Sequence, residues 1–319
     1  MAHDTPPGPR GAEGSRRSPV IDLLGAAALW GGMYVVSAAT FERIPPVTLA
    51  LVRILIGASV LLLAFRGRIG LGRAPLPRVV AAGAIVALTM VLQFVGTDLT
   101  GAAEGALLTT MTPAFVLLFG VVLERQRVPP GAWLGVVIAL AGVATLAARS
   151  GQFGAAGGPL LAGLPAPLVG DALLVLSAAT WALFSSVGRP LVEAVGAFRA
   201  ILQASLVAAV LLLPLAPLEL AGRPLPPIDI GTVGAALYLG IGSTALAWSL
   251  WYRGYARAPA TVSAAAFFAQ PLVGATLGVL LLREDLGAAF VAGATLISGG
   301  VLVIVFGSRS SRPQAARAR

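Results

Sequence analysis

Seven polar and aromatic residues lie near the middle of long apolar segments. They are Trp30, Tyr34, Gln93, Thr112, Trp181, Ser243 and Gln270. Polar groups within hydrocarbon are costly, so such residues face a cavity or a partner helix. Indole, phenol, hydroxyl and amide groups offer hydrogen bonds and apolar faces, but no nucleophile with its base. We therefore predict that these residues bind a solute; the alternative is that they bond neighbouring helices to one another.

The sequence contains no set of residues that would predict catalysis or metal binding. The chain has no cysteine, and its one histidine, His3, lies in a polar N-terminal stretch. Intramembrane proteolysis needs a serine–histidine pair, opposed aspartates or a histidine-bound metal. The Gly170–Asp171 pair, in contrast, stands alone at the end of a segment. We expect no catalytic residue, no metal site and no cofactor.

Two prolines interrupt apolar segments beside two of the predicted binding residues. Pro113 follows Thr112, and Pro271 follows Gln270. A proline inside a helix lacks the backbone N–H and leaves a carbonyl one turn earlier without its helical partner. Either carbonyl could hydrogen-bond to a solute; the alternative is that the prolines only kink their helices.

Arg53 is the charged residue that lies deepest in an apolar segment, one or two turns from its start. An arginine at the centre of a bilayer costs about 2.5 to 3.5 kcal/mol even on the gentler scales. We therefore expect Arg53 to reach the interface or to find a partner. Glu42 is the structural candidate, and an anionic group of a solute is the functional one.

The elements that must position these residues are membrane helices. The chain is 57% hydrophobic and only 11% charged, with a mean hydropathy of +0.91, whereas soluble domains carry about 25% charged residues. Since a spanning helix needs about 20 residues, we predict an all-α integral membrane protein with ten transmembrane helices. They cover residues 20–40, 46–65, 79–97, 104–123, 131–147, 169–187, 198–218, 231–251, 260–282 and 287–307.

The same unit occurs twice along the chain. A shift of 158 positions pairs Pro113 with Pro271, Gly120 with Gly278, Arg125 with Arg283, Gly135 with Gly293 and Gly142 with Gly300. Trp30 and Trp181 also occupy like positions after alanine-rich runs. Internal repetition of this kind decides the fold. We predict a tail at 1–18, a first five-helix repeat at 19–147, a linker at 148–168, a second repeat at 169–307 and a tail at 308–319.

Arginine placement predicts the orientation, because short cytoplasmic loops are rich in positive charge. With a cytoplasmic N-terminus, the outer segments contain only Arg43, Arg149, Arg223 and Arg283, and the other arginines outside the membrane fall on the cytoplasmic side. Both termini are then cytoplasmic, and repeats with an odd number of helices insert upside down relative to one another. Since topology accounts for the formal charge of +9, we expect no nucleic-acid partner.

Inverted repeats are typical of secondary transporters, whose solute site lies between the repeats near the midplane. Trp30-Gly31, Arg53, the two prolines, and Glu124 and Glu284 at the helix ends resemble the drug/metabolite transporter superfamily. More narrowly, residues 20–307 resemble its ten-helix EamA branch. Glu284 pairs with Gln126 rather than with Glu124 in the repeat, so we expect both acids to be interfacial turn and cap residues.

The resemblance implies a plasma-membrane protein, in contact with lipid, that exports amino acids, other small metabolites or drugs by alternating access. An uptake permease and a non-transporting scaffold are the alternatives. The bundle has no histidine and no carboxylate at clear mid-depth, which predicts movement down the solute gradient rather than proton coupling. The sequence does not specify the solute, the direction of transport or the oligomeric state.

Overall fold

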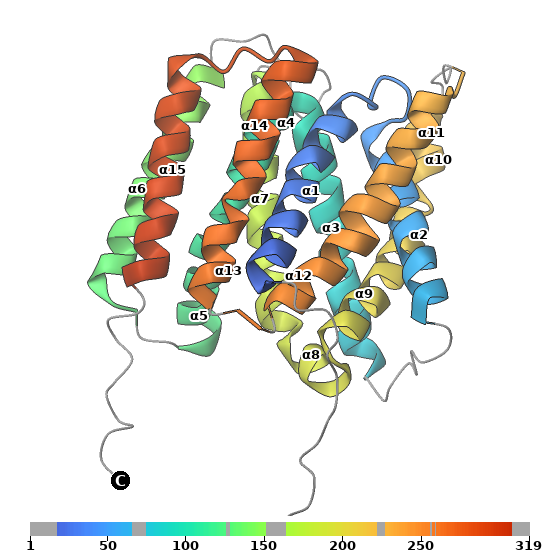
Figure 1. Cartoon of the computed structure of the whole chain (residues 1–319), viewed down its shortest axis with the longest axis horizontal. Helices are drawn as coiled ribbons and strands as arrows, with labels where there is room; N and C mark the ends of the chain where they lie inside the picture. Colours follow the sequence, from blue (N-terminus) through green and yellow to red (C-terminus); the bar gives the residue numbers. More distant parts are fainter. Residues whose placement is uncertain are drawn as a thin grey trace, which may run out of the picture.

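The computed structural model describes residues 18–65, 75–125, 128–150, 164–221, 227–255, 257–258 and 260–307. The regular elements in these ranges are helices, arranged as one bundle (Figure 1). The predicted tails, except for Ser18, and most of the predicted linker lie outside the described residues.

Helices of the first half begin where the sequence supplies an N-terminal signal. Ser18 accepts a hydrogen bond from Val20 N through its side chain, and prolines stand at the first or second position of several helices, where their missing N–H is not needed. The elements are α1 (Pro19–Ala38), α2 (Pro46–Phe65), α3 (Leu76–Thr100), α4 (Ala102–Leu108), η1 (Thr109–Met111), α5 (Thr112–Glu124) and α6 (Pro130–Ser150).

The second half is divided into more and shorter pieces. Its elements are α7 (Ala166–Val187), α8 (Arg189–Val195), α9 (Ala197–Leu212), α10 (Leu215–Leu220), α11 (Ile230–Leu237), η2 (Tyr238–Leu246), α12 (Ala247–Tyr255), α13 (Ala260–Phe267), α14 (Ala269–Leu282) and α15 (Gly287–Gly307). The stretch η2 is π-helical and joins α11 to α12.

The predicted number of ten spans is not confirmed. Within the described residues, eight helices are long and apolar enough to cross a membrane, or nine if α8 and α9 form one bent span. These two helices meet at an angle of 118°. The predicted helix 260–282 is broken at Phe268, which leaves α14 with 14 residues. Each of these regions has enough apolar residues for a span, but the periodicity of the sequence did not locate the helix breaks.

The two halves share local geometry at the positions that the sequence repeat pairs. Arg125 and Arg283 end α5 and α14 in the left-handed conformation, with φ of 52° and 56°. Their backbone N–H groups donate to the carbonyls of Gly120 and Gly278, which are also paired. The breaks before the two prolines correspond as well, since η1 and Phe268 both precede a proline by a few residues.

Equivalent helices of the two repeats run in opposite directions. Helices α6 and α15 pack side by side (Figure 1), with Gly135 against Gly300 and Gly142 against Gly293. A Cβ built on Gly135 would lie 2.6 Å from the carbonyl oxygen of Gly300, so only glycine permits this approach. The pairing is antiparallel, as an inverted repeat requires.

The first helix of each repeat packs against helices of the other repeat. Helix α1 packs against α14 and α12, and its counterpart α7 packs against α5 and α3. Large apolar side chains are exposed on the outside of the bundle, among them Leu63, Val137 and Leu272. A lipid-facing surface accounts for them, because lipid tails are as apolar as leucine.

Candidate functional site

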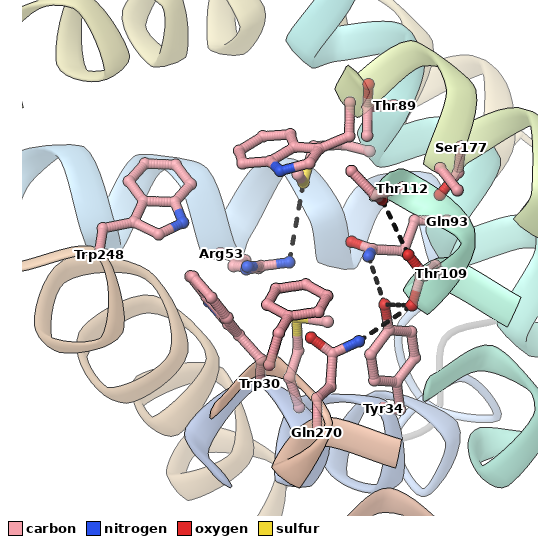
Figure 2. Close-up of a pocket in the computed structure, with 15 residues that line it drawn as sticks. Trp30, Tyr34, Arg53, Thr89, Gln93, Thr109, Thr112, Ser177, Trp248 and Gln270 are labelled. Atoms are coloured by element: carbon pink, nitrogen blue, oxygen red, sulfur yellow. Dashed lines mark hydrogen bonds between the residues drawn. The ribbon is translucent and has the colours of Figure 1, made fainter. Parts of the chain in front are cut away.

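A cavity of about 60 Å³ lies in the interior, between α1, α2, α3, α7, α12 and the two broken helices. Both repeats line it: Trp30 and Gln93 come from the first, and Trp181, Trp248 and Gln270 come from the second. Figure 2 shows Trp30, Gln93, Trp248 and Gln270 converging from several helices. The cavity continues into a vestibule of about 480 Å³, with which it shares Trp30 and Trp181.

Six of the seven residues predicted to bind a solute line the cavity: Trp30, Tyr34, Gln93, Thr112, Trp181 and Gln270. Ser243 does not line it. Its side chain is fully buried and donates to the carbonyl of Leu239, 2.7 Å away. The backbone carbonyl of Ser243 accepts a hydrogen bond of 3.0 Å from Trp30 Nε1. Ser243 therefore orients an aromatic wall of the cavity.

A hydrogen-bonded network centred on Thr109 closes one end of the cavity (Figure 2). The hydroxyl groups of Thr109 and Tyr34 are 2.7 Å apart, and Gln93 Nε2 donates to Tyr34 Oη at 2.7 Å. From the other repeat, Gln270 Nε2 donates to Thr109 Oγ1 at 3.0 Å and to the carbonyl of Ala106 at 3.2 Å. The network joins α1, α3 and α14 to the broken helix α4–η1–α5.

The carbonyl that Pro113 deprives of its helical partner belongs to Thr109. It is not available to a solute, because Thr112 Oγ1 donates to it at 2.8 Å and Thr112 N also donates to it. Pro113 and Pro271 do mark helix breaks, since η1 ends just before Thr112 and α13 ends three residues before Gln270. The breaks turn side chains, rather than the Thr109 carbonyl, toward the cavity.

Arg53 lies in the cavity wall and is only 2% exposed. Its Nε donates to Thr244 Oγ1 at 2.9 Å, and its guanidinium carbon lies 5.6 Å from the ring centre of Phe94. In the described part of the chain no ion pair joins it to Glu42 or to another carboxylate. The expected structural pairing with Glu42 is therefore wrong, and the reason is that Arg53 points into the bundle while Glu42 stands at its end.

Aromatic side chains line the passage from the cavity to the surface. The ring centres of Trp30 and Trp251 are 5.2 Å apart, and that of Phe267 lies 5.9 Å from Trp30 and 5.5 Å from Trp251. Ser185 and Val192 mark the outer part of the vestibule, close to α8. We call the side with α8 and the end of α12 the open end.

The opposite end, which we call the closed end, contains the loops before α4 and α15. There Glu284 reaches from the second repeat to the N-terminus of α4. Its Oε1 accepts from Ala102 N at 2.6 Å, and its Oε2 accepts from Ala103 N at 2.9 Å. Gly101 makes room for this carboxylate and has a φ of 121° that other residues rarely adopt. Glu284 thus caps a helix of the other repeat.

Two further contacts join the repeats at the closed end. Glu219 accepts hydrogen bonds from Val47 N at 3.0 Å and from Thr48 N at 2.7 Å, which caps α2. Arg43 forms an ion pair with Asp229, which also caps α11 through Thr232. Hydrogen bonds from the backbone and the hydroxyl of Thr232, and then from Arg43, hold the pKa of Asp229 below its usual range. Carboxylates therefore secure this end of the molecule.

Comparison with known families agrees with this architecture. The model of the EamA-like transporter family matches residues 18–148 and again residues 168–306. The chain belongs to the EamA-like transporter family. It is therefore a multi-pass membrane transporter, and the two matches fall on the two structural repeats.

Relatives of this EamA-like transporter include two proteins of Bacillus subtilis (strain 168). The uncharacterized transporter YetK is 27% identical over 291 residues, which are 89% of this chain and 86% of YetK. The uncharacterized transporter YwfM is 25% identical over 295 residues, which are 91% of this chain and 94% of YwfM. A solved crystal structure matches with a TM-score of 0.65 and 23% identity, covering 94% of this chain and all of the other, and shows the shared fold.

Sequence reasoning missed several residues that line the cavity of the EamA-like transporter, among them Thr109, Trp248 and Phe267. It also missed Thr244, which does not line the cavity but accepts a hydrogen bond from Arg53. Thr109 could have been found, since it lies four residues before Pro113 and owns the carbonyl that the proline affects. Thr244 was missed in favour of its neighbour Ser243. The stretch η2 is π-helical and has more residues in each turn than an α-helix. Spacing for an α-helix therefore does not show whether Ser243 or Thr244 faces α2.

Proposed function

We propose that this transporter exports a small organic solute by alternating access, with the cavity between the repeats as its solute site. The observation that carries the proposal is the asymmetry of the cavity. Its aromatic side opens into a vestibule, and its other side is closed by the Tyr34–Thr109–Gln270 network. A carrier requires a midplane site that is open to one side at a time.

Orientation follows from the charges at the two ends. The open end contains Arg189, Arg253 and Arg257, and positive charge favours the cytoplasm. Under this assignment the vestibule faces the cytoplasm and both termini are cytoplasmic. Export then means that the solute binds from inside the cell in this state and is released outside in the opposite one. A reporter active only in the cytoplasm should work when it is fused after Arg319, and activity of a fusion at Gly154 instead would reverse the assignment.

The cavity supports transport down the solute gradient. Among the described residues that line it there is no carboxylate and no histidine. Asp22, a buried carboxylate, is bonded at the open end to Arg253, with distances of 2.7 and 2.8 Å, and to Arg257. A proton gradient imposed on vesicles that hold equal solute on both sides should cause no accumulation. Accumulation that a protonophore abolishes would refute this part of the proposal.

The test of the site uses Gln270→Ala and Thr112→Ala. Cells with wild-type protein should retain less of the exported metabolites than cells without it, and either variant should reduce the efflux rate about tenfold or more at normal expression. Thr295→Ala is the matched control, because Thr295 is exposed and bonds only its own helix at Val291 O within the described contacts. Normal efflux by both site variants would show that the solute binds elsewhere.

A further inference from the structure

The positive charge of Arg53 lies in the interior of the bundle and faces the cavity. Arg53 lies in the middle of α2 and is 2% exposed, and neither Asp nor Glu occurs among the described residues that line the cavity with it. Charged residues inside a membrane bundle usually pair with one another or mark the path of a substrate. Since the structure shows no protein carboxylate on Arg53 in the described ranges, the second role fits this residue.

The hydrogen bonds of Arg53 leave part of its guanidinium group available. Arginine has five N–H donors in a planar fork. Thr244 takes the Nε donor at 2.9 Å, and the contact of Nη1 is to the sulfur of Met90 at 3.7 Å, a weak acceptor. The bond to Thr244 fixes the plane of the group. Figure 2 shows the guanidinium between Trp30, Trp248 and the polar network, where a bound solute would meet it.

A free acceptor lies in the same cavity. Gln93 donates through Nε2 to Tyr34 Oη, but its Oε1 is buried and has no hydrogen-bond partner within the described residues. An orphaned buried acceptor is costly, and a hydroxyl or N–H group of a solute would satisfy it. The cavity thus offers charged donors from Arg53 and a neutral acceptor from Gln93.

Aromatic rings form a large part of the remaining cavity wall. Trp30 contacts Phe267 with ring centres 5.9 Å apart, and Trp181 stacks on Phe184 at 5.4 Å. Flat apolar groups fit such a wall, because aromatic faces stack or meet edge to face at these distances. A solute that uses all of these features has an anionic group on a flat, apolar body.

We propose that the transported solute is an organic monoanion whose carboxylate binds the guanidinium of Arg53. This inference rests on the proposed transport function and narrows its substrate class. A carboxylate matches the guanidinium fork and forms charge-assisted hydrogen bonds with it. An amine would bring a second positive charge beside Arg53 and would find no carboxylate among the described cavity residues. Binding should therefore decrease from anion to zwitterion to cation.

Three probes that share one phenyl body separate these cases: 3-phenylpropanoate, phenylalanine and 2-phenylethylamine. Their affinities for the purified full chain in detergent can be compared by quenching of tryptophan fluorescence, since Trp30, Trp181 and Trp248 line the cavity. We expect 3-phenylpropanoate to bind at least about tenfold more tightly than 2-phenylethylamine. Equal binding of the two, or tighter binding of the amine, would overturn the inference.

Variants at position 53 test whether Arg53 causes the preference for the anion over the amine. Arg53→Gln should abolish the preference for the anion, and Arg53→Lys should keep it at reduced affinity because the charge remains but the fork is lost. Arg78→Gln, at an exposed position, is the control and should leave the preference unchanged. The ratio of two affinities does not depend on the fraction of folded protein. If Arg53→Gln does not fold, an affinity of folded Arg53→Lys for 3-phenylpropanoate equal to that of the wild type would contradict the proposal, because the guanidinium fork would then not bind the carboxylate.

Flux measurements distinguish this inference from the transport function itself. Liposomes with the wild-type protein should exchange labelled 3-phenylpropanoate. Exchange of the amine but not of the anion would leave the transport function standing and refute the anion site. Failure to move any of the three probes, or any extract of cellular metabolites, would refute the transport function and with it the inference.

Discussion

The two ends of the cavity are built from equivalent parts of the two repeats, yet they differ in exposure. Ser185 stands four residues after Trp181 and lines the vestibule at the open end, where it is exposed. Tyr34 stands four residues after the equivalent Trp30 and is 2% exposed, bonded to Thr109 at the closed end. Like positions in a repeated fold thus occupy two different environments, which is what one state of an alternating carrier requires.

The closed end is held by a few carboxylate contacts to backbone donors. Glu284 caps α4 and Glu219 caps α2, each from the other repeat. Since a typical hydrogen bond contributes about 0.5 to 1.5 kcal/mol net, a handful of them can keep an end shut and still be exchanged for solvent. Weakening these contacts one at a time tests whether they make the difference between the ends.

The largest effect is expected from Glu284→Ala. It leaves the N–H groups of Ala102 and Ala103 without their acceptor, and both residues are buried. We expect a loss of about 1 to 3 kcal/mol in unfolding free energy and a marked loss of transport. Thermal unfolding in detergent and efflux measure the two quantities.

Asp285→Ala is the matched control for Glu284, because its carboxylate is exposed and accepts from Gly287 N in its own loop. It should have little effect on transport. If Glu284→Ala transports and unfolds like Asp285→Ala, the cap does not secure the closed end.

A smaller effect is expected from Glu219→Ala, because Glu219 is only half-buried. The substitution removes the acceptor of Val47 N and Thr48 N and should cost about 1 kcal/mol, the usual cost of losing a helix cap. The comparison is Glu193→Ala, whose partner Arg189 is four residues away on the same exposed helix surface. If both variants lower the unfolding temperature equally, the contribution of Glu219 is no greater than that of a surface ion pair.

The smallest effect is expected from the exposed ion pair of Arg43 and Asp229, whose side chains are 43% and 50% exposed. Because its contacts lower the pKa of Asp229, the stability that this carboxylate contributes is present above its unfolded-state pKa and is lost as the pH falls through the lowered value. Asp229→Asn should remove this acidic dependence and change stability little near neutral pH. Unfolding temperatures from pH 3 to pH 7, roughly the range in which carboxylates titrate, test it, and an identical profile in the variant would be inconsistent with this role.

Much of the architecture could be predicted from the residues because membrane helices and repeats leave strong patterns. The pairing of Arg125 with Arg283 predicted two equivalent helix ends, and the structure has them. Trp30, Gln93 and Gln270 were predicted to share a site because they are polar or amphipathic residues near the middle of apolar segments, and all three line the cavity. The family of the chain was recognisable from the same residues.

The rest depended on geometry that a sequence does not encode locally. The breaks at η1 and Phe268 and the π-helical stretch η2 change which side chains face inward, so Thr244 could not be chosen by helical spacing alone. The role of Glu284 also depends on tertiary structure, because its partners Ala102 and Ala103 are far away in the sequence. The contacts of Arg53 within the described residues, Thr244 and Met90, also come from other helices, so the sequence around Arg53 did not reveal them.

Single cysteines at the two ends test alternating access most directly, since the chain has no cysteine of its own. Ser37→Cys places a thiol at a position that is 2% exposed near the closed end, and Ser185→Cys places one in the vestibule. A water-soluble maleimide should label the Ser185→Cys protein fast and the Ser37→Cys protein slowly. Adding Glu284→Ala to each should raise labelling at position 37 about tenfold and lower it at position 185. An increase at position 37 with unchanged labelling at position 185 would mean that the ends open independently, which would contradict alternating access.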